Sequence, residues 1–169
     1  MNKIISTILL IMVSPLVCKN HFELTAKSEN LKSLTFSAPE INLSSKEGLD
    51  RLTTPENGST TDDGMPELPV FTSYFQMEPG IAYDISYSVI SSYVIEDIDL
   101  YPYQGEPTIG INKPFIKNNS FYDSNLSYPE NKLIVSDPMI MRDVEVGLVS
   151  LIPFDYNPAL KTLTVYDLV

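Results

Sequence analysis

The side chains that could support catalysis begin with Cys18 and His21, the only cysteine and the only histidine among the 169 residues. A cysteine peptidase needs a base, usually histidine, held beside its nucleophile by a folded scaffold. The segment around this pair shows no strand or helix pattern, so we expect no enzyme activity from this chain by itself. Zinc sites take several His or Cys ligands, and phosphate-binding loops are rich in glycine. Because the sequence has neither pattern, it predicts no cofactor.

Two carboxylates in the stretch "EDID" are the remaining candidates for a metal site. If this stretch is a strand, Asp97 and Asp99 share one face, with Cα atoms roughly 7 Å apart. Such a pair could supply oxygen ligands to calcium. The alternative is two solvated charges on an outer face, which is the ordinary situation of acidic side chains and the interpretation that we favour.

Aromatic side chains that gather in or near one irregular stretch could stack on a sugar. The alternative is that they cover the edge of the core, and the absence of tryptophan, the strongest stacking side chain, favours this second interpretation. The six aromatic residues are Tyr101, Tyr103, Phe115, Phe121, Tyr122 and Tyr128.

The chain is acidic, with 22 Asp and Glu against 11 Lys and Arg and a formal net charge of −11. The excess is concentrated between Leu52 and Asn112, where ten acids occur and no Lys or Arg. Nucleic acid is not an expected partner, because phosphate binding needs a basic patch. An acidic face suits a basic protein surface or a cation, and otherwise it maintains solubility.

The N-terminal third of the chain is predicted to contain two segments without a fold of their own. Residues 1–19 resemble an export signal, because Lys3 precedes an apolar run from Ile4 to Val13 that is too short to span a bilayer. We expect secretion or display at the cell surface, with lipid attachment at Cys18 as an alternative. Residues 20–63 are rich in Ser, Thr, Asn, Glu and Lys and predict a flexible leader, with a short helical turn in "SSKEGLDRL".

Period-two alternation predicts an all-β domain over residues 64–169. Its clearest example is "IAYDISYSVIS" at 81–91, where large apolar residues alternate with mostly small polar ones. One buried and one wet face are typical of antiparallel sheets. The predicted fold is therefore an antiparallel β-sandwich of about six or more strands. Besides 81–91, strands are expected at 70–76, 92–101, 132–136, 142–154 and 161–169, with an irregular loop over 103–131.

Ordered motifs stand at both ends of this domain. At the start, "GMPELPV" and a hydrophobic run are followed by Pro79 and Gly80, just before the alternating strand. Near the other end, Arg142 is followed by "PFDYNP" and then "LTVY". In this order the region resembles the N-terminal pro-region of gingipain-type cysteine peptidases. The matching residues are Gly64, Pro66, Leu68, Pro69, Val70, Pro79, Gly80, Arg142, Pro153, Tyr156, Asn157, Pro158, Leu163, Val165 and Tyr166.

The resemblance implies a non-catalytic module, exported by bacteria, that assists the folding of a cysteine peptidase and keeps it latent. Its partner would be the cognate catalytic domain, which this chain lacks, so the chain would be a truncated product, a fragment or a free-standing homologue. A loop would place a basic side chain in the peptidase's acidic specificity pocket. The candidates are Lys113, followed by a proline that resists cleavage, and Lys117. The alternative function is a free-standing secreted β-sandwich that binds carbohydrate or a surface partner.

Overall fold

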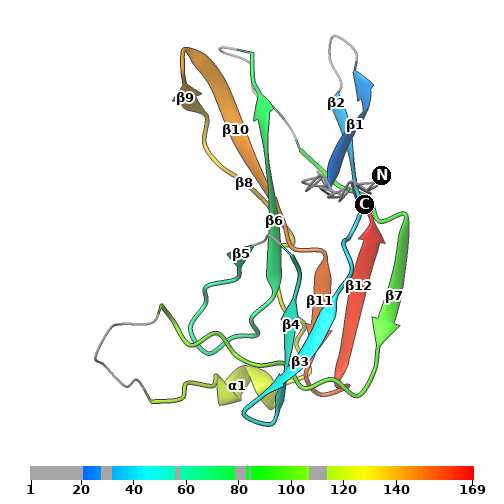
Figure 1. The fold of residues 1–169 in the computed structure, drawn as a ribbon, viewed down its shortest axis with the longest axis vertical. Helices are drawn as coiled ribbons and strands as arrows, with labels where there is room; N and C mark the ends of the chain where they lie inside the picture. The colour runs from blue at the N-terminus through cyan, green and yellow to red at the C-terminus, as the bar shows by residue number, and fades with distance from the viewer. Residues whose placement is uncertain (1–20, 28–31, 56–57, 79–82, 84, 107–113) are drawn as a thin grey trace, which may run out of the picture.

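A computed structural model describes most of the chain and shows an all-β fold. The described residues form twelve strands and one short helix (Figure 1). This composition confirms the predicted fold class. The described residues are 21–27, 32–55, 58–78, 83, 85–106 and 114–169. The elements are β1 Phe22–Lys27, β2 Lys32–Phe36, β3 Asn42–Lys46, β4 Leu49–Thr53, β5 Gly58–Ser59, β6 Pro69–Gln76, β7 Ser91–Ile95, α1 Asn119–Tyr122, β8 Leu133–Val135, β9 Met139–Met141, β10 Val144–Leu151, β11 Phe154–Asn157 and β12 Thr162–Leu168.

Two antiparallel sheets form the body of the molecule. The first has the order β5-β6-β10-β8, with β9 paired to β10 as well, and the second has the order β11-β12-β7 (Figure 1). The hairpins β1–β2 and β3–β4 complete the pairing of the described strands. In the first sheet β10 is central, because it pairs with β6 on one side and with β8 and β9 on the other.

One continuous apolar core joins the two sheets and the N-terminal hairpins. Phe71 and Leu151 come from the first sheet and Leu163 and Val165 from the second, and none of the four is more than 3% exposed. Burying each such side chain contributes roughly 1.5–3 kcal/mol to the free energy of folding. The core thus supplies the main stabilisation of a chain whose described part contains no disulfide.

Most of the predicted strands are confirmed. The segments 70–76, 132–136 and 161–169 correspond to β6, β8 and β12. The predicted strand 142–154 contains β10, and the predicted strand 92–101 is formed only as far as Ile95, the end of β7. Strands β9 and β11 were not predicted as strands separate from their neighbours.

The segment with the clearest alternation does not form a strand where it is described. Residues 85–90 have no strand partner, and Tyr87, Val89 and Ile90 are 42–65% exposed, while 81, 82 and 84 lie outside the described residues. The pairing between β7 and β12 ends at Ser91, which lies opposite Leu168. The second sheet therefore offers this segment no strand to pair with beyond Ser91. An alternating pattern alone is not sufficient to form a strand.

The interpretation of residues 20–63 as a flexible leader is wrong for most of the described part. Strands β1 to β5 lie in this segment, and Phe22, Phe36 and Leu52 are 8%, 2% and 3% exposed in the core. The Phe36 amide donates to Val169 O at 2.8 Å, and the Val169 amide donates back to Phe36 O at 3.1 Å. These long-range contacts are invisible to local periodicity.

The predicted helical turn in "SSKEGLDRL" is instead the β3–β4 hairpin. Glu47 and Gly48 have φ angles of +53° and +81°, which are the left-handed values of a tight two-residue hairpin turn. Every residue of β3 is exposed, so this strand has no alternating burial that a sequence pattern could report. The glycine was the one local signal for the hairpin.

Candidate functional site

A loop with both stems anchored is the candidate functional site. It leaves the core along Tyr103–Glu106 and returns along 114–118 into α1, and residues 107–113 between the stems lie outside the described residues. We call these two stems and the residues they connect the clamped loop. In Figure 1 the stems lie on the same side of the molecule as α1, below the first sheet.

The side chain of Gln104 joins the two stems of the clamped loop. Its Nε2 donates to Ile116 O at 2.8 Å and to Pro102 O at 2.9 Å, and its Oε1 accepts from the Ile116 amide at 2.8 Å. The pair of bonds to Ile116 imitates one rung of a β-ladder, with a side-chain amide in place of a backbone one. Gln104 therefore closes the base of the loop.

Gly64 forms the floor beneath both stems. Its amide donates to Tyr103 O at 2.9 Å, and its carbonyl accepts from the Asn118 amide at 3.0 Å. Its φ is +75°, and a Cβ atom added here would lie 3.0 Å from Asn118 N and 3.1 Å from a methyl carbon of Ile116. Glycine is needed because any side chain would add left-handed strain and push the returning stem away.

The returning stem ends in the first turn of α1. Asn118 is the N-cap of this helix, and its side-chain oxygen accepts from the Phe121 amide at 3.2 Å. The amino group of Lys117 lies 4.2 Å from the ring centre of Tyr122, whose hydroxyl donates to Leu100 O at 2.9 Å. Burial raises the pKa of Tyr122 far above its ordinary value, so this anchor stays neutral and keeps donating.

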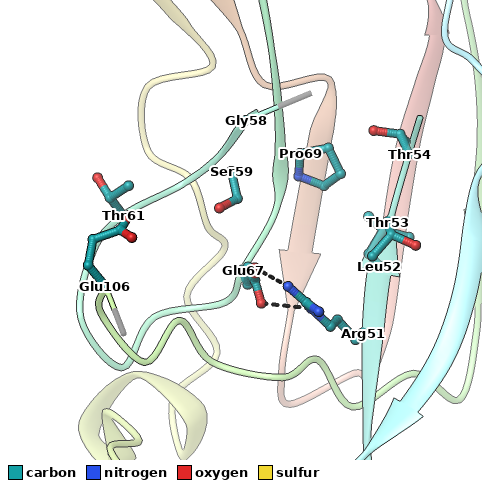
Figure 2. A pocket seen from close by; sticks show the side chains of 10 residues that line it. All are labelled: Arg51, Leu52, Thr53, Thr54, Gly58, Ser59, Thr61, Glu67, Pro69 and Glu106. Atoms are coloured by element: carbon teal, nitrogen blue, oxygen red, sulfur yellow. Dashed lines mark hydrogen bonds and ion pairs between the residues drawn. The ribbon is translucent and has the colours of Figure 1, made fainter. Parts of the chain in front are cut away.

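A polar cleft of about 440 Å³ lies beside the outgoing stem, with Glu106 at its wall (Figure 2). Across its floor, Arg51 of β4 donates through two nitrogens to both carboxylate oxygens of Glu67, at 2.9 and 3.1 Å. This hydrogen bonding raises the pKa of Arg51. The pair connects β4 to the segment before β6, and its two hydrogen bonds direct Nε and Nη2 of Arg51 to Glu67.

Of the two lysines proposed from the sequence, only Lys117 lies in the described part. Its contact with the Tyr122 ring holds it against the core edge rather than extended away from the loop. Lys113 lies outside the described residues, and the next residue, Pro114, is exposed at the start of the returning stem.

The motif residues before β6 that are described hold the fold together. Pro66 forms an isolated antiparallel bridge with Pro102, Leu68 is fully buried, and Pro69 begins β6. Pro79 and Gly80 lie outside the described residues.

The motif residues near the C-terminus shape the second sheet. Pro153 O accepts from the Tyr166 amide at 2.9 Å, and Tyr156 is fully buried. Asn157 Oδ1 accepts from the Leu160 amide at 3.1 Å and so forms the turn that contains the buried Pro158. Arg142 has a φ of +48° in the β9–β10 turn, where it is exposed.

The carboxylate pair that the sequence suggested is not placed on one face of a strand. Strand β7 ends at Ile95, and Asp97 has a left-handed φ of +56°. Asp99 instead lies 3.5 Å from the Lys161 amino group, and its amide donates to the side chain of Asp50 at 2.8 Å. Among the described residues, no three or more His, Cys, Asp or Glu are grouped to hold a metal.

The sole histidine has a structural position. His21 Nδ1 lies 3.2 Å from Ser37 O, and its ring packs edge-on against Phe71 with centroids 5.4 Å apart. Its expected neighbour Cys18 lies outside the described residues. The expectation that no folded structure holds His21 is therefore wrong. The structure that holds its ring is the apolar core.

The aromatic group proposed as a sugar platform is mostly internal. Tyr101, Phe121, Tyr122 and Tyr128 are 3–8% exposed, and only Phe115 is largely open at 48%. Four of the six rings therefore cannot present a face to a sugar. These four rings cover the core edge beneath the clamped loop.

Gln104 and Asn118, which make the clamp and the cap, were missed by the sequence analysis. Asn118 precedes Asn119-Ser120-Phe121, and an asparagine before an apolar pair is a recognisable cap signal. Gln104 has no such signal, because its partner Ile116 lies twelve residues away across a loop without periodicity.

The family model Propeptide_C25 matches residues 30–169. The chain belongs to the C25 propeptide family. Two curated relatives are gingipain R2 of Porphyromonas gingivalis, 30% identical over 116 residues, and gingipain R1 of the same organism, 27% identical over 146 residues. These alignments cover 66% and 83% of this chain, but only 15% and 14% of the relatives, so the propeptide matches a small part of their length.

Two solved structures share the fold of this propeptide. One is the complex of P. gingivalis RgpB pro- and mature domains, with a TM-score of 0.75, 24% identity, and coverage of 89% of this chain and 83% of that chain. The other concerns the zymogenic latency of gingipain K, with a TM-score of 0.73, 18% identity, and coverage of 93% and 92%. The resemblance read from the motifs is confirmed, and the match begins within the segment interpreted as a leader.

Family membership determines the general role of the chain. It is the pro-region type of domain found in gingipain-like cysteine peptidases, and a propeptide is not an enzyme by itself. Within the described residues, no helix is both long enough and apolar enough to cross a membrane.

Proposed function

We propose that this propeptide keeps its cognate gingipain-like cysteine peptidase latent by placing the clamped loop in the active-site cleft. The observation that carries the proposal is the closure of the loop base by Gln104, with hydrogen bonds of 2.8–2.9 Å to Ile116 of the returning stem and to Pro102 just before the outgoing one. A loop with a fixed base loses less conformational entropy on binding than a free peptide. If the peptidase cuts such a loop, the clamp holds the new ends together and slows their release.

The side chain proposed to fill the specificity pocket is Lys113, with Lys117 as the second candidate. Lys117 would have to leave the Tyr122 ring, 4.2 Å away, before it could reach a partner. Lys113 precedes Pro114, which lacks an amide hydrogen and constrains the backbone on the leaving side of the bond. Both features support Lys113 as the residue that a peptidase binds but cuts slowly.

Assistance in folding the catalytic domain and export from a bacterial cell complete the proposal. Export rests on Lys3 and the apolar run Ile4–Val13, which is typical of a signal peptide. Expression in a bacterial host, followed by N-terminal sequencing of protein from the medium, tests it. A mature N-terminus near residue 20 is expected, and retention of Met1 in the cytoplasm contradicts export.

The latency proposal is tested by inhibition of the purified mature catalytic domain of gingipain R2. The wild-type propeptide is expected to inhibit, and Gln104→Ala to raise the inhibition constant about tenfold, because the loop base opens. Gln104→Glu keeps the shape but replaces a donor by a carboxylate facing Pro102 O and Ile116 O, so it should inhibit no better than Gln104→Ala.

Lys113→Ala and Lys117→Ala form the matched pair for the pocket residue. The first is expected to weaken inhibition strongly, and the second to leave it within about twofold, because only Lys113 would contact the peptidase. Thermal unfolding of each variant checks that the fold is retained. Unchanged inhibition by Gln104→Ala and Lys113→Ala together would show that the clamped loop is not the inhibitory element.

A further inference from the structure

Strand β7 ends the second sheet, and its outer edge has no strand partner in the described part of the chain. On its inner side it pairs with β12 over Ser91–Ile95, in the sheet order β11-β12-β7. In Figure 1 the outer side of this strand forms the right-hand border of the molecule. We call the outer side of Ser91–Ile95 the β7 edge. Such an edge presents unpaired backbone N–H and C=O groups, to which the complementary structure is another strand.

The side chains of β7 do not protect this edge. Natural edge strands commonly carry a lysine, another charge or a proline, which prevents pairing with a second chain. The sequence of β7 is Ser-Ser-Tyr-Val-Ile, with neither a charge nor a proline. The other strands of four or more residues at the ends of the described sheets all contain a charged residue, for example Lys46 in β3 and Asp155 in β11. Strand β7 is therefore the exception among them.

The β7 edge belongs to a longer uncharged stretch that is open to solvent. Residues 85–95, "ISYSVISSYVI", contain no Asp, Glu, Lys or Arg, although 20% of the whole chain is charged. Ile90, Tyr93 and Val94 are 65%, 45% and 53% exposed. Large apolar side chains grouped at an unpaired edge indicate a surface that a second strand covers.

We propose that the β7 edge pairs with the β7 edge of a second copy of this chain, antiparallel and about a two-fold axis at Tyr93. The pairing joins two three-stranded sheets into one sheet of six strands, in the order β11-β12-β7-β7-β12-β11. Because two identical strands in antiparallel orientation use the same edge, the contact closes on itself and gives a dimer. This inference does not depend on the latency mechanism.

The register centred on Tyr93 uses every residue of β7. It places Tyr93 opposite its own copy, Ser92 opposite Val94, and Ser91 opposite Ile95. Every residue of the strand therefore meets an uncharged residue, and the central pair is aromatic, which is one of the favourable cross-strand combinations. The edge presents no charged side chain that would select a foreign strand, whereas a second copy always offers the matching edge.

The distribution of charge favours the antiparallel orientation in spite of the net charge of −11. Glu96 is the first acid after β7 and lies three residues from Tyr93. In the antiparallel pair the two copies of Glu96 lie at opposite ends, roughly 20 Å apart along the strands. They repel each other little, because the Debye length at physiological salt is about 8 Å. At the other end of β7, Asp167 accepts a hydrogen bond from the Ser91 hydroxyl at 2.6 Å.

The clamped loop stays accessible in this dimer. In Figure 1 its stems lie on the left of the molecule and β7 lies on the right. A dimer through the β7 edge therefore carries its two clamped loops at opposite ends. Each copy keeps its loop free to contact a peptidase.

Sedimentation velocity of the protein between about 1 and 200 μM measures the association. Reductant is present throughout, so that Cys18 cannot link two chains by a disulfide. Five strand positions with a few apolar side chains make a small interface, so we expect a dissociation constant of about 10 μM. A wild type that remains monomeric at the highest concentration overturns the proposal.

Three single substitutions to lysine separate the β7 edge from a general effect of charge. Tyr93→Lys and Val94→Lys each place two cations close together across the pair, and both should raise the dissociation constant about tenfold or more. Leu43→Lys is the matched control and should dimerise like the wild type, because Leu43 is 49% exposed on β3, a strand that already carries Lys46. Thermal unfolding checks that each variant is folded.

A charge-swap pair tests the two-fold register. Tyr93→Lys and Tyr93→Glu should each be monomeric, and an equimolar mixture should dimerise because opposite charges then meet at the axis. Failure of the mixture to associate, with both variants folded, overturns the proposed pairing. An equal loss of the dimer in Leu43→Lys, or its persistence in Val94→Lys, overturns the β7 edge. A monomeric wild type whose inhibition of gingipain R2 falls in Val94→Lys assigns the edge to the peptidase and overturns the proposal.

Discussion

The β3–β4 hairpin and residues 85–90 each adopt the opposite of the structure that their sequence patterns predict. The hairpin lies in a polar stretch without alternation, yet its strands pair over five positions and Leu52 is only 3% exposed. Residues 85–90 belong to the most regular alternating stretch of the chain, yet they have no strand partner, and Ile90 is 65% exposed.

The difference shows that a strand requires a partner backbone and an anchor in the core. The hairpin has both, because its turn brings β3 back along β4, and the carbonyl of Asp50 accepts from the Tyr101 amide at 2.8 Å. Residues 85–90 lie beyond the end of the β7–β12 pairing at Ser91, where no partner strand is available. The alternation of apolar and polar residues indicates which face of a strand each residue would occupy. Backbone pairing with a neighbouring strand decides whether the strand forms.

The strongest test of this comparison is Phe36→Ala, in the segment that looked like a leader. Phe36 is 2% exposed and packs against Phe71 with ring centroids 4.9 Å apart. Its loss should lower the free energy of unfolding by about 3–5 kcal/mol, because a cavity is left in the core. Urea unfolding measures the change. A wild-type midpoint would mean that the N-terminal strands do not belong to the folded unit.

Alkaline pH gives the second test, at a tyrosine of the core. Burial raises the pKa of Tyr156 to about 12 from the ordinary value of 10.0. The folded state therefore favours the neutral phenol, so this contribution is complete below pH 10 and is lost as the pH rises toward about 12.

Unfolding by urea at a series of pH values, for the wild type and Tyr156→Phe, checks this prediction. Tyr156→Phe should reduce the fall in stability between pH 10 and 12. Identical profiles for Tyr156→Phe and the wild type would contradict the assigned cause.

A smaller effect is expected at the ion pair that connects the β3–β4 hairpin to the rest of the fold. Arg51→Ala leaves Glu67, whose side chain is 14% exposed, without its 2.9 Å partner. The expected loss is roughly 1 kcal/mol. Lys161→Ala is the matched control, because its contact with Asp99 is 3.5 Å long and both side chains are more exposed, at 58% and 38%. Equal losses for the two variants would argue against a special role for Arg51.

The smallest effect should come from Val89→Ser in residues 85–90. Val89 is 42% exposed and lies outside every described strand, so the free energy of unfolding should change by less than about 0.5 kcal/mol. Thermal unfolding with wild type measured in parallel is sufficient. A loss comparable to that of Phe36→Ala would show that the alternating segment is buried in solution.

The site itself was partly predictable. The motif around Gly64 marked the place where both stems of the clamped loop rest, and the basic candidates were restricted to Lys113 and Lys117. Gln104 could not be found, because its three hydrogen bonds span residues from 102 to 116 within a stretch that has no regular pattern.

By itself, the sequence determined the all-β class, the family through ordered motifs at both ends of the domain, and the scarcity of nucleophile and base. These properties depend on residue type and on local alternation, which a single chain displays directly. Only the tertiary structure shows that residues 22–53 contain core strands and that Gln104 closes the base of the loop. Each of these depends on contacts between segments that are distant in sequence. A local pattern does not show which distant segments the folded chain brings together.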